Sequence, residues 1–347
     1  MQTMIEAANA HLAGAIDFVV LPGDNADDGT EPQFRLVRDA VDRLRLPLHV
    51  LPGDHDFKQR SLEAFYRVLA TDALPKSLRK AGARCLFLDV VSAGSGGADF
   101  RLDEGRLAWL ERDLDQAATA GERTVIFMHT YPADLKAGAE ALRALIDKHR
   151  VAAVDMGHTH YNELANDGRT IFSATRSTGQ TEEGPVGFSL AALDGSVVSW
   201  RFKPLAGAWP FVLITSPADE RLITDPAASD QVARDAVHVR AKVWSGQGIA
   251  RVECRIDQGE WRAMSPLPGA AALWQARCAA PGHRFALSVR AHDRHDGTDE
   301  ETIRVASSGY DPPTRRADGS DADAIDAWPE KGILGTQLGP NKNGKQW

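Results

Sequence analysis

Four short segments of the chain combine carboxylates and imidazoles with glycine or proline. They read GDNAD at residues 23–27, GDHD at 53–56, HTYP at 129–132 and GHTH at 157–160. Aspartate oxygens and histidine nitrogens together suit divalent Zn, Mn, Fe or Co better than a soft metal. The glycine before Asp24, Asp54 and His158 allows a sharp backbone turn and leaves room beside an ion. These segments therefore predict a metal site.

Two features of spacing support this expectation. Residues i and i+2 of an extended backbone point the same way, so we expect His158 and His160 to face one cavity. A carboxylate such as Asp24 can bridge two cations with its two oxygens, and two-metal sites about 3.5–4 Å across are commonly built in this way. The sequence is thus compatible with one cation or with two.

Each of the four segments follows a predicted strand. The β-rich runs lie at residues 17–24, 47–56, 124–129 and 151–158, with further strands at 85–91, 169–175, 186–193 and 195–202. Helical periodicity occupies residues 1–16, 31–46, 57–69, 102–121 and 133–150. Strands that alternate with helices indicate a layered α/β domain, in which ligand groups converge at the C-terminal ends of the strands.

The character of the sequence changes near residue 205. From 211 to about 306, short strand candidates with turn residues between them indicate an all-β sandwich of about 100 residues. We interpret Cys254 and Cys278 as core residues rather than as a disulfide, since free cysteine is commonly buried. We therefore expect an α/β domain over 1–205, a β-sandwich over 206–310 and an extended tail over 311–347.

One cluster in the second domain resembles a further metal site. His292, Asp293, His295 and Asp296 lie within five residues of one another. An Asp-Gly pair between two β runs is, however, a signal for a hairpin turn. We predict a turn there.

Composition excludes several classes of protein. The chain has 347 residues, a formal net charge of −8 and no block rich in lysine and arginine, which disfavours a nucleic-acid polymer as partner. No apolar run reaches the roughly 18–20 residues that a membrane span needs. Residues 1–16 form an amphipathic pattern without the basic start of a signal peptide, so we expect a cytoplasmic protein with a small-molecule partner. A homo-oligomer is left open.

GDNAD, GDHD, a strand that ends in Met-His, and GHTH, in this order and spacing, resemble the calcineurin-like metallophosphoesterases. Within that family the sequence is most similar to the bacterial cyclic-nucleotide phosphodiesterase-like branch. The resemblance covers roughly residues 1–203. It implies a layered metallophosphoesterase α/β sandwich, here followed by a C-terminal all-β sandwich that we expect to be immunoglobulin-like.

The resemblance also implies roles for individual residues. Its metal ligands would be Asp24, Asp54, His129, His158 and His160. Asp24 would bridge both cations, His160 would bind the first, and the other three would bind the second. His55 would be catalytic rather than a ligand, contacting the phosphate and stabilising or protonating the leaving oxygen. Asp54 stands where the family usually has asparagine, and its charge should strengthen metal binding and weaken the attraction of an anionic substrate.

One motif of the family has no counterpart here. A D-x-H sequence at the end of the family's first strand supplies two ligands of the first cation, and nothing upstream of Asp24 matches it. His11 lies in the middle of a predicted helix and is a poor substitute. Only Asp24 and His160 remain for the first cation, so we expect the second site to fill and the first to bind weakly. We further expect an exposed sheet edge beside residues 17–24 and a longer ancestral protein.

Two functions follow from this pattern. The first is a metal-dependent phosphoesterase that hydrolyses phosphodiesters, cyclic-nucleotide-like or promiscuously, by metal-activated water. The alternative is a degenerate relative that holds a single cation and acts as a binding or scaffold module.

Overall fold

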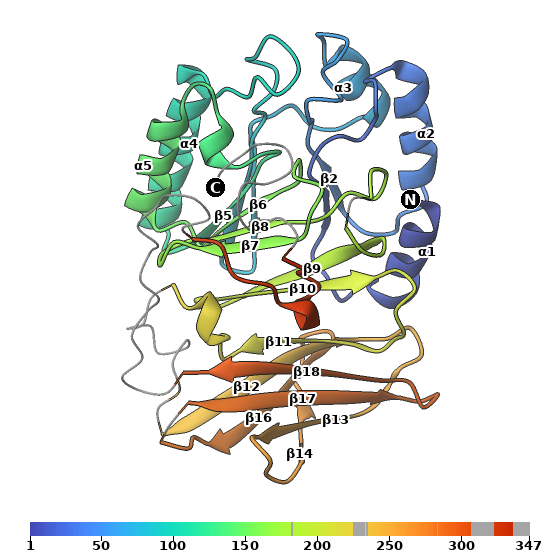
Figure 1. Ribbon diagram of the computed structural model, residues 1–347, viewed down its shortest axis with the longest axis vertical. Helices are drawn as coiled ribbons and strands as arrows, with labels where there is room; N and C mark the ends of the chain where they lie inside the picture. Colours follow the sequence, from blue (N-terminus) through green and yellow to red (C-terminus); the bar gives the residue numbers. More distant parts are fainter. Residues whose placement is uncertain (182, 225–232, 234, 283, 307–322, 336–347) are drawn as a thin grey trace.

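The computed structural model describes the whole chain except residues 182, 225–232, 234, 283, 307–322 and 336–347. Helices and strands alternate in its N-terminal part, and two packed β-sheets follow below them in Figure 1. The helices are α1 (Gln2–His11), α2 (Glu31–Val41), α3 (Glu63–Leu69), α4 (Glu104–Thr119) and α5 (Ala139–His149). The expected α/β layering is thus confirmed for this part.

The largest sheet has six strands in the order β3-β4-β5-β6-β8-β7. Their bounds are β3 (Lys76–Lys80), β4 (Ala83–Phe87), β5 (Arg123–Phe127), β6 (Ala153–Met156), β7 (Glu163–Asn166) and β8 (Ile171–Ala174). The four inner strands run parallel, whereas the edge strands β3 and β7 are antiparallel to their neighbours. The sequence analysis missed both edge strands, because they are short and mix apolar with charged or polar residues.

Two smaller sheets complete the α/β part. β1 (Val19–Leu21) pairs in parallel with β2 (Leu48–Val50), and β9 (Gly187–Asp194) forms a hairpin with β10 (Val197–Pro204). Within the described residues, β2 is the sole strand paired with β1. The apolar side chains of β1 are only half-buried, which agrees with the expected sheet edge at this position.

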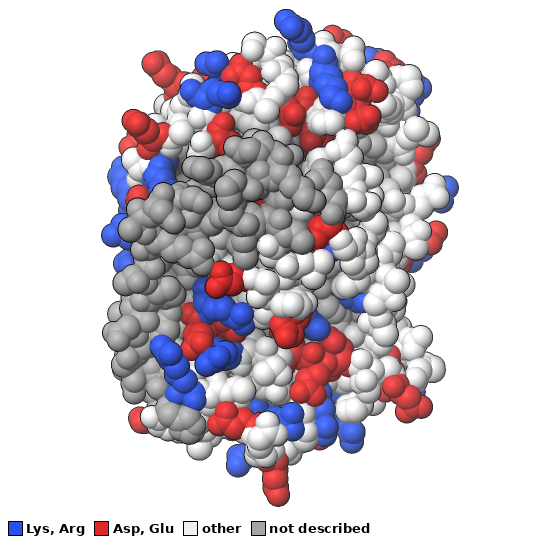
Figure 2. All heavy atoms as spheres, viewed as in Figure 1, with Lys and Arg blue, Asp and Glu red and all other residues white. Residues whose placement is uncertain are grey.

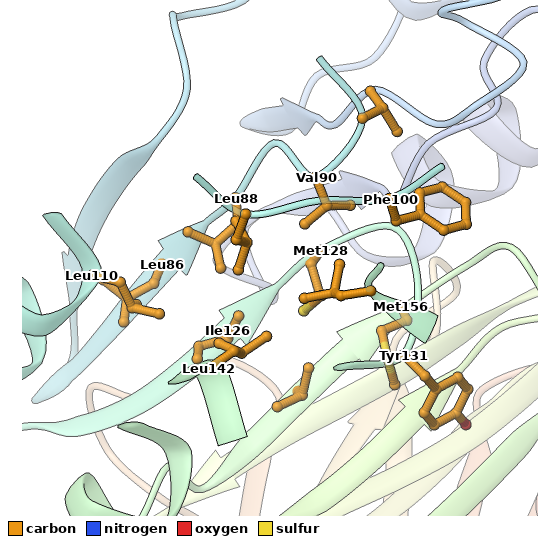
Figure 3. Packing of buried hydrophobic residues seen from close by; sticks show 14 of the residues in the cluster. Leu86, Leu88, Val90, Phe100, Leu110, Ile126, Met128, Tyr131, Leu142 and Met156 are labelled. Carbon is orange, nitrogen blue, oxygen red and sulfur yellow. The ribbon is translucent and has the colours of Figure 1, made fainter. Parts of the chain in front are cut away.

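One hydrophobic core joins the six-stranded sheet to the helices. Leu86, Ile126 and Met128 from β4, β5 and the residue after β5 are fully buried, and Leu110 of α4 and Leu142 of α5 pack into the same cluster (Figure 3). The helices thereby cover one face of the sheet and fix the directions of β5 and β6. Both strands end at candidate ligands, so this packing sets the positions of two imidazoles.

Helix boundaries differ from the prediction in several places, and the helix expected over 1–16 already ends at His11. The expected helix 133–150 is a 3-10 turn, η1 (Pro132–Asp134), followed by α5, because Gly138 adopts a left-handed φ of 86° and interrupts the periodic run. The expected helix 57–69 begins only at Glu63, and the expected helix 31–46 ends at Val41. Helix boundaries depend on capping and on tertiary contacts more than on periodicity.

After β10, the chain forms two four-stranded antiparallel sheets, ordered β11-β12-β16-β15 and β14-β13-β17-β18. Their bounds are β11 (Phe211–Ser216), β12 (Ala236–Trp244), β13 (Ile249–Ile256), β14 (Arg262–Ala263), β15 (Ser265–Pro266), β16 (Leu273–Ala279), β17 (Phe285–Asp293) and β18 (Thr298–Val305). A 3-10 helix, η2 (Glu220–Leu222), lies between β11 and β12, and another, η3 (Pro329–Lys331), follows β18. Both sheets contribute to one apolar core. Cys254 and Cys278 lie in it as free thiols with their sulfurs 3.7 Å apart, which confirms them as core residues.

The histidine-rich cluster near residue 295 is a turn. β17 and β18 form an antiparallel hairpin, and the Asp293 carboxylate between them accepts hydrogen bonds from the backbone N–H groups of His295 and Gly297. Asp296 has a φ of 65°, as this type of tight connection requires. The prediction of a hairpin turn is confirmed.

Charged side chains of both signs are interspersed on the face shown in Figure 2. No single-sign patch of the kind that would attract a polyanion stands out on its coloured part. A search of the described helices finds none with the length and hydrophobicity of a membrane-spanning segment. The tail expected over 311–347 lies largely outside the described residues, and its residues 323–335 pack against the rest of the protein.

The assigned core can be tested with one chemical change at two sites. Leu86 is fully buried in β4, whereas Leu36 on α2 is 71% exposed. Leu86→Ala should lower the free energy of unfolding by about 2–5 kcal/mol, because it removes buried methyl groups and leaves a cavity. Leu36→Ala should change it by less than about 0.5 kcal/mol. Urea denaturation followed by circular dichroism measures both, and equal effects would contradict this assignment.

Candidate metal centre

The loops after four strands bring four side chains together. Asp24 follows β1, Asp54 follows β2, His129 follows β5 and His158 follows β6. One ligand atom from each lies within 4.8 Å of the other three. We call these residues the four-ligand group. It unites positions as far apart in sequence as 24 and 158 because their strands end on the same side of the fold.

His129 occupies the centre of the group. Its Nδ1 lies 2.7 Å from the carbonyl oxygen of Pro22, and a carbonyl can only accept, so Nδ1 carries a hydrogen. Its Nε2 lies 3.2 Å from Asp54 Oδ1 and 3.5 Å from Asp24 Oδ1. The side chain is only 1% exposed. The backbone thus fixes the ring with Nε2 directed at the two carboxylates, which is the orientation that a metal-binding histidine needs.

His158 follows β6, the parallel neighbour of β5 in the six-stranded sheet. Its Nδ1 lies 3.2 Å from Asp54 Oδ1. The ring of Phe100 packs edge-on against it with 4.8 Å between the centroids. Phe100 is fully buried, so it closes the group off from the apolar core and limits the rotation of the imidazole.

Two glycines make this close approach sterically feasible. A Cβ atom at Gly23 would lie 2.1 Å from His129 Nδ1, and a Cβ at Gly53 would lie 2.1 Å from Asp24 Oδ1. Both distances are far below van der Waals contact. Any other residue at either position would displace a member of the four-ligand group. A cradle that only glycine allows, lined by two carboxylates and two imidazoles, fits a divalent cation.

The backbone of the group is held in a sparsely populated conformation. Asp24 and His158 have φ values of 55° and 63°, and His160 has 67°. Residues other than glycine seldom adopt this left-handed region, and those that do gather at functional sites. The strain coincides with three of the five predicted ligands.

His160 is the predicted ligand that the four-ligand group does not include. The expectation that His158 and His160 face one cavity assumed an extended backbone. The left-handed φ of both residues makes the segment a turn instead, so the i, i+2 rule for strands does not apply. His11 lies elsewhere: its ring stacks on Trp209 at 4.0 Å, and its Nδ1 accepts from the N–H of Gly246.

The pKa values in the four-ligand group are shifted because two carboxyl groups, Asp24 and Asp54, lie beside the buried imidazole of His129. Burial opposes the ionised forms of Asp24 and Asp54, but His129 outweighs it, and the pKa of both carboxyl groups lies below the ordinary value. Burial alone would lower the pKa of His129, whereas the two carboxylates raise it to about 10. In the metal-free protein the imidazolium of His129 therefore supplies the positive charge that the carboxylates need.

The sequence analysis gave no role to Asp56, the last residue of GDHD. Its carboxylate is fully buried and accepts hydrogen bonds from the N–H of Gly53, the N–H and side-chain amide of Asn25 and the N–H of Ala26. Burial raises its pKa to about 6, which leaves it ionised at neutral pH. It ties the Asp24 loop to the Asp54 loop, and its place in the motif was the only signal for it in the sequence.

His55 lies beside the group rather than in it. Its N–H donates to Asp24 Oδ1 at 3.0 Å. Its ring Nδ1 lies 2.9 Å from the carbonyl oxygen and 3.0 Å from Oδ1 of Asp27. Both are acceptors, so Nδ1 carries a hydrogen and Nε2 carries the lone pair of the neutral ring. Asp27, the last residue of GDNAD, thus orients the His55 ring.

Cation binding should release a proton. Because the pKa of His129 is raised to about 10, the ring is protonated at neutral pH and must lose that proton before Nε2 can bind a metal. Affinity for Mn²⁺ should therefore rise between pH 6 and pH 9, by up to about tenfold per pH unit for one proton. Calorimetric titration in buffers of different ionisation enthalpy counts the protons. Binding without proton release would exclude His129 as a ligand.

Comparison with known proteins also indicates similarity to phosphoesterases. Residues 2–162 match the family described as Calcineurin-like phosphoesterase. The chain is 29% identical over 158 residues to a probable glycerophosphodiester phosphodiesterase GpdQ of Arcobacter nitrofigilis, covering 42% of this chain and 56% of that protein. It is 32% identical over 133 residues to the 3',5'-cyclic adenosine monophosphate phosphodiesterase CpdA of Escherichia coli K12, covering 38% and 46%.

Among solved structures, a dimetal phosphatase from Danio rerio aligns with a TM-score of 0.46 and 17% identity over 55% of this chain and 82% of that one. The alignments with the two curated relatives span about half the length of those proteins. The matched region contains all five ligands that the resemblance implied, Asp24, Asp54, His129, His158 and His160. Residues 2–162, somewhat less than half of the chain, are thus similar to the calcineurin-like phosphoesterase family.

Proposed function

We propose that this chain is a metal-dependent phosphoesterase that hydrolyses small phosphodiesters. The observation that carries the proposal is the four-ligand group, whose ligand atoms lie within 4.8 Å of one another, with His55 beside it. Hydrolysis of a phosphate ester is a reaction that a cation in such a site assists. The names of the relatives, a glycerophosphodiester and a cyclic-nucleotide phosphodiesterase, support diesters as the substrate class.

The four-ligand group would hold one divalent cation of the Mn, Zn, Fe or Co class, because its donors are two carboxylates and two imidazoles. When bound, the cation supplies Lewis-acid chemistry for attack of water on phosphorus. Asp24 also serves as a positioning group, since it accepts the N–H of His55. We propose that Asp24 further shares a weaker second cation with His160, which lies two residues beyond His158.

His55 is the proposed catalytic residue. Its Nδ1–H donates to Asp27, so Nε2 is the ring nitrogen that we propose contacts the substrate. When the ring is doubly protonated, Nε2 can donate to a phosphate oxygen or to the departing alkoxide, and the Asp27 carboxylate stabilises that imidazolium. Lys58, whose Nζ lies 3.5 Å from Asp27 Oδ1, moderates the negative charge of the same loop.

A single-metal binding or scaffold module is the second candidate. One observation favours it: His160, the ligand expected for the first cation, lies outside the four-ligand group. Among the described residues, the ligands for a single cation are therefore grouped closely. The two candidates differ in whether bound metal is accompanied by turnover. The presence of an oriented His55, which a pure binding module does not need, supports the enzyme.

We also propose the domain division of 1–205, 206–310 and 311–347, with an immunoglobulin-like architecture for the middle part. The change from alternating helices and strands to strands alone after β10 supports the first boundary. Two four-stranded antiparallel sheets around one core support the architecture.

The proposed activity is tested directly with a chromogenic diester. The purified chain, supplied with Mn²⁺ or Zn²⁺, should hydrolyse bis(p-nitrophenyl) phosphate, and a chelator should abolish turnover. Elemental analysis should find one tightly bound cation per chain, because the four-ligand group is complete and the second site is not. His129→Ala should lose both metal and activity. Stoichiometric metal with no turnover of any diester would favour the binding module.

The role of His55 is separable from metal binding. His55→Ala should lower kcat by about 100-fold or more, the usual contribution of a general acid, with metal content unchanged. Asp27→Asn should give a smaller loss, because the ring remains but its orientation and charge are less well supported. Parallel measurement of kcat and bound metal is decisive: equal losses of both in His55→Ala would identify His55 as a ligand.

A further inference from the structure

The C-terminal segment 323–335, which we call the strap, packs along the edge strand β7. The N–H of Asn166 donates to the carbonyl of Asp323 at 2.7 Å, and the N–H of Ile325 donates to the carbonyl of Leu164 at 2.8 Å. The pairing of Ala165 with Ala324 is antiparallel. The strap, red in Figure 1, thus satisfies the outer edge of the six-stranded sheet.

Buried side chains anchor the strap to both halves of the molecule. Trp328 is only 2% exposed, and the guanidinium of Arg221 lies 3.2 Å above its ring. Lys331 is equally buried and forms an ion pair with Glu301 of β18, in the β-sandwich. A buried ion pair requires both partners in place, since a lone charge there would be strongly destabilising. The strap therefore has a defined position relative to the sandwich.

The strap also contacts the loop that carries two of the predicted metal ligands. The carbonyl oxygen of Gly332 accepts hydrogen bonds from the side-chain amide of Asn162, at 3.0 Å, and from the guanidinium of Arg176. Asn162 Oδ1 in turn accepts the N–H of Arg176 at 2.8 Å. Asn162 and Arg176 are 2% and 3% exposed. These bonds form a closed, buried network.

This network continues into the metal loop. Asn162 follows His158 by four residues, and the N–H of Ser177, next to Arg176, lies 3.4 Å from the carbonyl of His160. The left-handed φ of His158 and His160 is a conformation that persists only when the surroundings hold it. Among the described residues, Asn162 supplies the buried side chain that links this loop to the strap.

We propose that Asn162 is a positioning residue for the metal ligand His158, and that the strap, through the Gly332 carbonyl, holds it in place. The β-sandwich thereby contributes to the metal centre through Lys331, although it provides no member of the four-ligand group. This inference rests on the proposed metal centre. Partners that orient a metal ligand through the backbone or a hydrogen bond typically affect metal affinity by about 10–100-fold when removed.

A matched pair of substitutions tests the proposal in the full chain. Asn162→Ala should raise the dissociation constant for Mn²⁺, followed by the electron paramagnetic resonance signal of the free ion, by about tenfold or more. Asn166→Ala is the control, because its side-chain amide donates to the carbonyls of Arg221 and Ile223 and not to the metal loop. It should lower thermal stability by a similar amount and leave the affinity for Mn²⁺ unchanged.

A second variant tests the strap without touching the loop. Trp328→Ala should loosen the strap, weaken Mn²⁺ binding and increase hydrogen exchange at the amides of residues 157–162. If Asn162→Ala and Trp328→Ala lower stability but bind Mn²⁺ as the wild type does, the strap is purely structural and the proposal is wrong. If the wild type itself binds no Mn²⁺, the proposed metal centre fails instead, and the two failures are thereby distinguished.

Discussion

The arrangement of the site depends on two partly buried carboxylates that lie close together. Asp24 and Asp54 come from the ends of neighbouring parallel strands, and their oxygens belong to one group with atoms within 4.8 Å. Like charges at this distance, away from bulk water, repel strongly unless positive charge lies between them. The imidazolium of His129 supplies it in the metal-free protein, and a divalent cation would replace that charge.

Holding these charges together has a conformational cost that other residues offset. Asp24 and His158 adopt left-handed backbone conformations, each of which costs about 1–3 kcal/mol. Gly23 and Gly53 remove the side chains that would block the approach. Asp56, through its four accepted hydrogen bonds, joins the two loops into one unit. The site is therefore built by loops, but it is fixed by a buried polar network beneath them.

The β-sandwich is connected to this site through the strap rather than through a shared ligand. Lys331 binds Glu301 on one side, and Gly332 binds Asn162 and Arg176 on the other. Adjacent residues of one segment therefore contact the two halves of the molecule. The strap thereby links the two C-terminal sheets to the segment around Asn162.

Much of the architecture was determined by the sequence alone. The alternation of apolar runs and helical periodicity predicted the α/β part, and the Asp-Gly pair predicted the β17–β18 turn. Four motifs indicated the resemblance and five metal ligands, four of which form the four-ligand group. These signals are local, because a strand followed by Gly-Asp or Met-His is readable within about ten residues. The family itself follows from the order of the motifs.

Other features were decided only by tertiary structure. The edge strands β3 and β7 have polar sequences, and their partners rather than their own residues make them strands. His160 lies outside the four-ligand group and has a left-handed backbone. Asp56 accepts hydrogen bonds from a distant loop, and the strap contacts Asn162 from 170 positions away. Such contacts leave no periodic pattern in the chain. They depend on which surfaces meet once the core has formed, and only the folded structure contains that information.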